Sequence, residues 1–237
     1  MANKRLALID GDIVAYSVGF KAEGDPVSHA LHSAKVMCEN IQDAAKCEEY
    51  QIFLTGANNF RITTATVQPY KGNRTQPKPT HLPDIREYLA KHKGAMLTDG
   101  IEADDALGIT QLNPPEDTNT VICTIDKDLD MIQGEHYCWR GKRKGTYFID
   151  EDEANLNFYR QLMKGDAGDH IPGMYKYCKM KATEKVMAPL EHCTTEKERY
   201  EYVVSIYGQG VVKHGAQYNM TIDEFLTEIG QLLWIHR

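Results

Sequence analysis

Short apolar runs alternate with longer amphipathic stretches along the first two thirds of the chain. RLALI (5–9) and TVICTI (120–125) have the length of buried strands, and an aspartate directly follows each. YQIFLT (50–55) and AMLT (95–98) are further short runs rich in β-forming residues. The stretches between the runs carry helical patterns, at roughly 25–49, 82–93 and 103–111.

This order predicts an α/β fold with a central, mostly parallel sheet flanked by helices, because strands that alternate with helices are joined by right-handed crossovers. Such sheets bind ligands beyond the carboxyl ends of their strands, so Asp10 and Asp126 are expected at one edge. Later in the chain the pattern is mainly helical, at 181–190, 195–206 and 222–235. We expect a core over 1–165 and a C-terminal helical region over 166–237.

Ten carboxylates lie in four short segments, LIDGD, IEADDALG, TIDKDLDMI and MKGDAGDHIPG. Each pair of acids at contact distance repels by about 1 kcal/mol even in water, so a fold that gathers them needs a cation. Oxygen ligands favour Mg²⁺ or Mn²⁺ over zinc. The acids are Asp10, Asp12, Glu102, Asp104, Asp105, Asp126, Asp128, Asp130, Asp166 and Asp169.

Two pairs of acids have helical spacing. Glu102 and Asp105 stand at i and i+3, which places both on one face of a helix start. Asp166 and Asp169 have the same spacing, and a second helix start is predicted there, where the helix dipole favours negative charge. A single aspartate after a strand is more often a turn or cap residue, and it is the repetition over four segments that favours a metal site.

Five elements, in this order, resemble the 5′-nuclease family of flap endonucleases, phage 5′–3′ exonucleases and the 5′-nuclease domain of bacterial DNA polymerase I. They are LIDGD, PYKGNR (69–74), IEADDALG, TIDKDLDMI and GDAGDHIPG, and they span about residues 5–173. The resemblance implies a PIN-like fold and a metal-dependent hydrolase of DNA phosphodiester bonds. The activity would be 5′–3′ exonuclease, flap or structure-specific endonuclease, in phage-type DNA replication or degradation.

The resemblance also implies two Mg²⁺ ions, with Mn²⁺ as a substitute. By position, Asp10, Glu102 and Asp104 would hold one ion, and Asp10 and Asp104 also count as catalytic. Asp105, Asp126, Asp128 and Asp166 would hold the second, with Asp169 close by, while Asp12 and Asp130 would stand behind these ligands. The family usually has another aspartate after its second strand. Here the segment LTGANNFR (54–61) carries no carboxylate, which predicts a weaker first metal site.

Basic and aromatic residues supply the implied DNA contacts. Lys71 and Arg74 match the pair that contacts the scissile phosphate, and Tyr70 stands where the family stacks an aromatic ring on a terminal base. WRGKRKGTY (139–147) predicts a hairpin tip that presents Lys142 and Arg143 to DNA. The segment 173–187 lacks the family's glycine-rich hairpin but carries Lys176, Lys179 and Lys181.

The net charge of −7 comes largely from the acidic segments, and bound cations would offset part of it. No apolar run reaches membrane-spanning length, the N-terminal stretch does not resemble a signal peptide, and the six cysteines show no paired spacing, so we expect a cytoplasmic protein. The expected partner is DNA with a 5′ end, flap or junction, or an RNA primer, and not a membrane. Two alternatives stay open: a PIN-like ribonuclease, and a DNA-binding homologue with a weakened metal site.

Overall fold

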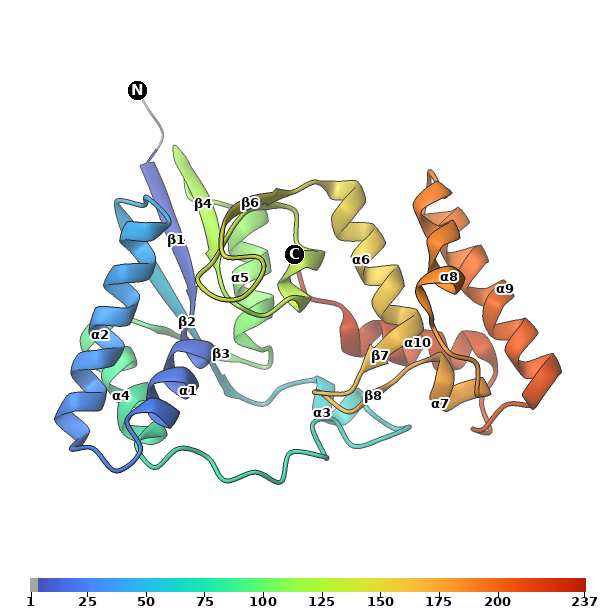
Figure 1. Cartoon of the computed structure of the whole chain (residues 1–237), viewed down its shortest axis with the longest axis horizontal. Coiled ribbons are helices and arrows are strands. Elements are labelled where there is room, and N and C mark those ends of the chain that lie inside the picture. The colour runs from blue at the N-terminus through green and yellow to red at the C-terminus, as the bar shows by residue number, and fades with distance from the viewer. Residues whose placement is uncertain (1–3) are drawn as a thin grey trace. The chain divides into compact units, whose positions relative to one another are not determined.

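The computed structural model describes residues 4–237, which form two compact units (Figure 1). The first unit is built around a mostly parallel sheet. The first unit contains the residues up to Asn59, Gln76–Asp150 and Ile235–Arg237, and the second contains Phe60–Thr75 and Glu151–Trp234. The boundary expected after residue 165 lies inside the second unit.

The elements of the first unit are β1 (Lys4–Asp10), α1 (Gly11–Lys21), α2 (Val27–Ala44), β2 (Glu49–Ala57), α4 (Leu82–Lys93), β3 (Met96–Asp99), α5 (Ala103–Leu112), β4 (Thr118–Cys123), the 3₁₀ helix η1 (Asp128–Met131), β5 (Gly134–Cys138) and β6 (Gly145–Ile149).

The strand order β3-β2-β1-β4-β5-β6 confirms the predicted α/β fold. Neighbouring strands are parallel except β5 and β6, which form an antiparallel hairpin whose tip includes Lys142 and Arg143. In the register, Asp10 pairs with Phe53 of β2, and Ile9 pairs with Cys123 of β4. The carboxyl ends of β1 and β4 therefore lie side by side.

The central strands are apolar throughout because both faces of the sheet are covered. Ala7 and Ile9 of β1 point into a core with α1, α2 and α4, whereas Leu8 points into a second core with α5. Figure 1 shows these helices on opposite faces of the sheet. Helix α1 directly follows β1 and was not among the predicted helices, while the pattern over 25–49 yields the shorter α2 followed by β2.

Helices build the second unit. Its core packs Tyr177 against Phe225 with ring centroids 4.4 Å apart, and Tyr207 also belongs to it. Capping boxes at Thr195 and Thr221 start the two C-terminal helices. The elements are α3 (Arg61–Thr64), α6 (Glu151–Lys164), β7 (Gly165–Asp166), β8 (Ile171–Pro172), α7 (Met174–Cys178), α8 (Glu184–Met187), the 3₁₀ helix η2 (Ala188–His192), α9 (Glu196–His214) and α10 (Ile222–Leu233).

The helix start predicted at Asp166 and Asp169 is wrong. Asp166 ends the short strand β7, residues 167–170 form a turn, and β8 returns antiparallel. The Asp166 carboxylate accepts hydrogen bonds from the backbone N–H groups of Gly168 at 2.6 Å and Asp169 at 3.2 Å. Aspartate competes for nearby backbone donors in this way, which favours turns over helices.

Candidate metal and nucleic-acid sites

Asp10 lies at the carboxyl end of β1 and caps the N-terminus of α1. Its Oδ1 accepts a hydrogen bond from the Ile13 N–H at 3.0 Å, and its Oδ2 accepts one from the Thr124 hydroxyl at 2.8 Å. The residue is 2% exposed. Burial, followed by the charges of Asp12 and Asp126, raises the pKa of Asp10 to about 7. A carboxylate in this position is stabilised by a proton or by a nearby cation.

The segment after β4 forms a chain of hydrogen bonds at the same edge of the sheet. The Thr124 hydroxyl accepts from the Asp126 N–H at 3.0 Å, and Asp126 Oδ1 accepts from the Asp128 N–H at 2.9 Å. Asp128 begins η1 and lies 3.3 Å from the Lys127 ammonium. Asp10 and Asp126 therefore lie at one edge of the sheet, as predicted. The three acids Asp10, Asp126 and Asp128 are called the rim acids below.

Glu102 is the N-cap residue of α5, and Asp105 is buried at position N3. Asp105 Oδ2 accepts from the Glu102 N–H at 2.9 Å, and its Oδ1 accepts from the His236 N–H at 2.9 Å. Both oxygens of Asp105 therefore bind backbone amides, which gives this residue a structural role. Asp104, one position earlier, is only partly buried.

Asp12 and Asp130 are each held by an arginine. Asp12 accepts from the Thr55 N–H at 2.9 Å and from Arg86. Asp130 accepts from the Tyr147 hydroxyl at 2.8 Å and from Arg143, whose guanidinium also donates to the Ile125 carbonyl. Arg143 thus joins the hairpin tip to the loop that carries Asp126.

The chemistry of the rim acids suits a hard divalent cation, because they offer carboxylate oxygens. Within residues 4–237, no group of three or more His, Cys, Asp or Glu side chains is arranged so that it could hold a metal ion. Carboxylates repel one another when no cation lies between them. Metal binding at this edge would therefore require the rim acids to turn toward a shared ion.

In the second unit, Asp169 organises the predicted basic segment. Its Oδ2 accepts from the Tyr70 hydroxyl at 2.6 Å and lies 3.6 Å from Lys71 Nζ, and its Oδ1 accepts from Arg74 at 2.5 Å. The Asp169 carbonyl also accepts from the Lys71 N–H at 2.8 Å. Lys71 Nζ lies 4.9 Å from the Tyr70 ring centroid, within cation–π range. The structure therefore joins two sequence motifs that are about a hundred residues apart.

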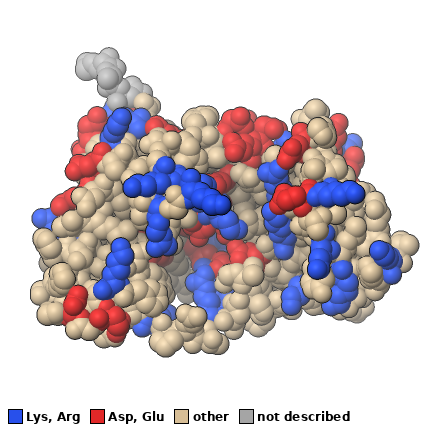
Figure 2. All heavy atoms as spheres, viewed as in Figure 1, with Lys and Arg blue, Asp and Glu red and all other residues tan. Residues whose placement is uncertain are grey.

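The remaining predicted cations are exposed. Lys142 lies at the tip of the β5–β6 hairpin, and Lys and Arg atoms gather over this hairpin in Figure 2. Lys176 lies in α7, and Lys179 is the C-cap residue after that helix, with its ammonium 5.9 Å from the Tyr175 ring centroid. Lys181 follows in the segment before α8. All are placed where an anionic partner could reach them.

Two residues at the carboxyl edge of the sheet, Asp99 and Thr124, were not predicted from the sequence. Asp99 ends β3, as Asp10 ends β1, and it accepts a hydrogen bond from Asn58 at 2.8 Å. The run AMLT followed by an aspartate was the signal that could have found it. Thr124 orients both Asp10 and Asp126, but a threonine at the end of a strand carries no distinguishing signal.

No protein-family model matches the sequence. Solved structures resemble the fold over almost the whole chain. The flap endonuclease of bacteriophage T5, in a complex with DNA and metal ions, is 13% identical with a TM-score of 0.61, and the match covers 97% of this chain and 99% of that one. The T5 5′-exonuclease with bound zinc is 15% identical with a TM-score of 0.56, covering 98% and 100%.

The catalytic core of Rad2 in complex with a DNA substrate is a third similar structure. It is 13% identical with a TM-score of 0.50, and the match covers 98% of this chain and 79% of that one. Together with the sheet order and the rim acids, these matches establish that the protein has the PIN-like 5′-nuclease fold. At this identity they establish the fold alone.

Proposed function

We propose that this protein is a Mg²⁺-dependent 5′-nuclease that hydrolyses DNA at a 5′ end, flap or junction, as an exonuclease, an endonuclease or both. The observation that carries the proposal is the placement of the rim acids at the carboxyl ends of β1 and β4 of a 5′-nuclease fold. In parallel sheets this edge is where ligands bind.

The rim acids, with Glu102 and Asp104, are the proposed ligands, and Mg²⁺ or Mn²⁺ bound there would supply a Lewis acid that activates water. Asp10 keeps its carboxylate fixed through Ile13 and Thr124. Asp105 positions the start of α5 through its two backbone contacts. Direct ligation by Asp105, Asp166 and Asp169 stays a prediction from the resemblance.

The basic segment of the second unit is the proposed phosphate contact. Lys71 offers a compact charge and Arg74 a planar guanidinium, both suited to an anionic phosphodiester. Asp169 holds both cations and the Tyr70 hydroxyl, which limits their mobility before DNA binds. Tyr70 supplies an aromatic face for base stacking.

The test is cleavage of a 5′-labelled flap by the wild-type protein with Mg²⁺ and with EDTA, in DNA and in RNA of the same sequence. We expect Mg²⁺-dependent cleavage of DNA and its loss in Asp126→Asn. The matched control is Asp117→Asn, an exposed aspartate just before β4, at the opposite end of that strand from Asp126. It should cleave like the wild type.

The RNA arm separates the alternatives. Efficient cleavage of RNA but not DNA would replace the proposal by a ribonuclease activity. Binding of the flap without any metal-dependent cleavage would replace it by a DNA-binding role. No helix within residues 4–237 is long and apolar enough to cross a membrane.

A further inference from the structure

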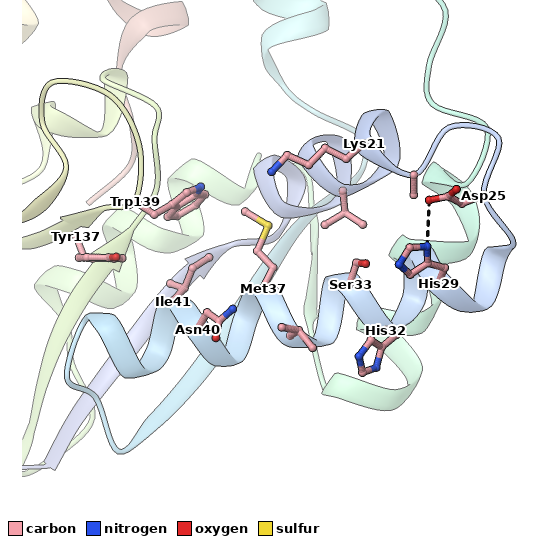
Figure 3. A pocket seen from close by; sticks show the side chains of 13 residues that line it. Lys21, Asp25, His29, His32, Ser33, Met37, Asn40, Ile41, Tyr137 and Trp139 are labelled. Carbon is pink, nitrogen blue, oxygen red and sulfur yellow. Dashed lines mark hydrogen bonds and ion pairs between the residues drawn. The ribbon is translucent and has the colours of Figure 1, made fainter.

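A cavity of about 540 Å³ lies in the first unit, lined by residues of α1, α2 and the end of β5 (Figure 3). Its volume is within the range of roughly 300–1,000 Å³ typical of small-molecule sites. None of the residues predicted for metal or DNA binding lines it. Lys21, which contributes to the lining, ends α1 at the opposite end from the Asp10 cap.

The lining combines an apolar floor, an aromatic wall and a cation. Val18 and Ile41 are buried, the half-buried indole of Trp139 forms one side, and the exposed Lys21 extends toward it (Figure 3). Within residues 4–237, the side chains of Lys21, Asn40 and Trp139 have no hydrogen-bond or ion-pair partner. These polar groups are available to a ligand that also covers apolar surface.

The charges around the cavity favour an anion. Three exposed cations follow Trp139 along the hairpin tip, namely Arg140, Lys142 and Lys144. The acid in the lining, Asp25, lies 3.0 Å from the His29 ring, which offsets its charge when protonated. A flat apolar group in the cavity, joined to several negative charges along the hairpin, is the ligand that fits both features.

We propose that this cavity binds an unpaired base of a single-stranded DNA segment, stacked on Trp139, with Lys21 contacting an adjacent phosphate and the hairpin-tip cations following the strand. Stacking of bases on aromatic rings beside a basic track is the usual mode of single-strand binding. The proposal rests on the proposed function for its substrate class. It adds a binding site for a strand that is not being cleaved.

The experiment measures binding in EDTA, so that it does not depend on cleavage. Adding an oligothymidylate to the wild-type protein should quench tryptophan fluorescence, and the quenching should be lost in Trp139→Phe, which leaves Trp234 as the remaining tryptophan. By fluorescence anisotropy of a labelled oligonucleotide, Trp139→Ala should weaken binding at least about fivefold, and Trp139→Phe should retain most of it. Lys21→Gln should weaken binding and reduce its salt dependence by about one ion.

Two controls keep the test specific. Phe148→Ala removes an aromatic side chain of the same hairpin that is 68% exposed and does not line the cavity, and its affinity should match the wild type. An abasic oligonucleotide of equal length carries the phosphates without bases, and it should bind more weakly and quench nothing. Equal affinity for the two oligonucleotides, or quenching that survives in Trp139→Phe, would overturn the proposal. Either result leaves metal-dependent flap cleavage, measured separately, unaffected.

Discussion

The Thr124 hydroxyl donates a hydrogen bond to Asp10 Oδ2 at 2.8 Å and so joins the end of β1 to the segment after β4. Asp10 has little access to solvent, and its two carboxylate oxygens accept from Ile13 and Thr124. These bonds favour the ionised form, but burial outweighs them and raises the pKa of Asp10 to about 7. Keeping this charge buried in the metal-free protein therefore costs stability.

Asp10→Asn should stabilise the metal-free protein at pH 8 by about 2 kcal/mol, because a buried charge near Asp12 and Asp126 is removed. The asparagine retains a carbonyl oxygen that can accept from Ile13. The measurement is thermal unfolding in EDTA, with Asp117→Asn as a control that should leave the melting temperature unchanged. The same Asp10 variant should lose nuclease activity. A lower melting temperature for Asp10→Asn would show that the hydrogen bonds outweigh the burial of charge.

Asp105 and Asp104 are adjacent in sequence but should respond differently to the same substitution. Asp105→Asn places an NH₂ group against backbone N–H donors of Glu102 or His236, and should destabilise the protein by about 1–3 kcal/mol. Asp104→Asn, at a position that is only partly buried, should change stability less than Asp105→Asn does. Urea unfolding in EDTA measures both. An Asp105→Asn variant as stable as wild type would show that these two backbone hydrogen bonds do not stabilise the start of α5.

Asp128 and Asp130 lie in one turn of 3₁₀ helix and provide a matched pair for metal binding. Asp128→Asn should weaken Mg²⁺ binding about tenfold or more, because Mg²⁺ affinity depends strongly on ligand charge. Asp130→Asn should have little effect on affinity, since Arg143 and Tyr147 already engage that carboxylate. Calorimetric titration of the metal-free protein, with Mg²⁺ and then with Mn²⁺, is the measurement. The reverse order of effects would contradict the assignment of the rim acids.

Lys71 and Lys142 should separate chemistry from binding. Lys71→Ala should lower the single-turnover rate by about a hundredfold or more, as expected when a charge next to the transition state is lost. Lys142→Ala should instead weaken DNA binding and reduce its salt dependence by about one ion. Rapid-quench kinetics and anisotropy give the two quantities. If both variants changed binding alone, Lys71 would belong to a surface patch.

His136 should make stability depend on pH. It is fully buried, its Nε2 lies 2.8 Å from the Ile132 carbonyl, and burial lowers its pKa below the ordinary value. The unfolded chain therefore binds a proton more readily than the folded one. The contribution of neutral His136 to the free energy of unfolding should be fully present above about pH 6.5. It should fall as the pH decreases below that value, by up to about 1.4 kcal/mol per pH unit.

Replacing His136 by Gln should remove this part of the pH dependence below about pH 6.5, although it lowers stability overall. The control is His214→Gln, at an exposed position in the last turn of α9. Urea unfolding at several pH values measures the slope for each variant. An unchanged slope in His136→Gln would assign the pH dependence to other groups.

The sequence by itself determined the features that depend on a few neighbouring residues, namely the buried strands and the acids that directly follow them. Buried strands read as apolar runs because both sheet faces are covered, and an aspartate after such a run had to lie at the carboxyl edge. The order of strands and helices was enough to predict the α/β fold. Asp10 and Asp126 could be placed together for this reason alone.

Only the tertiary structure decided which partners each acid contacts. Both carboxylate oxygens of Asp105 accept from backbone amides, and one of these donors, His236, lies 131 residues later in sequence. Asp130 accepts a hydrogen bond from Arg143 at the tip of the β5–β6 hairpin. Asp166 and Asp169 lie in a turn and not in a helix, and Asp169 accepts hydrogen bonds from Tyr70 and Arg74. Spacing along the chain specifies which face an acid occupies, whereas its charge and its free oxygens depend on partners that are distant in sequence and come close only on folding.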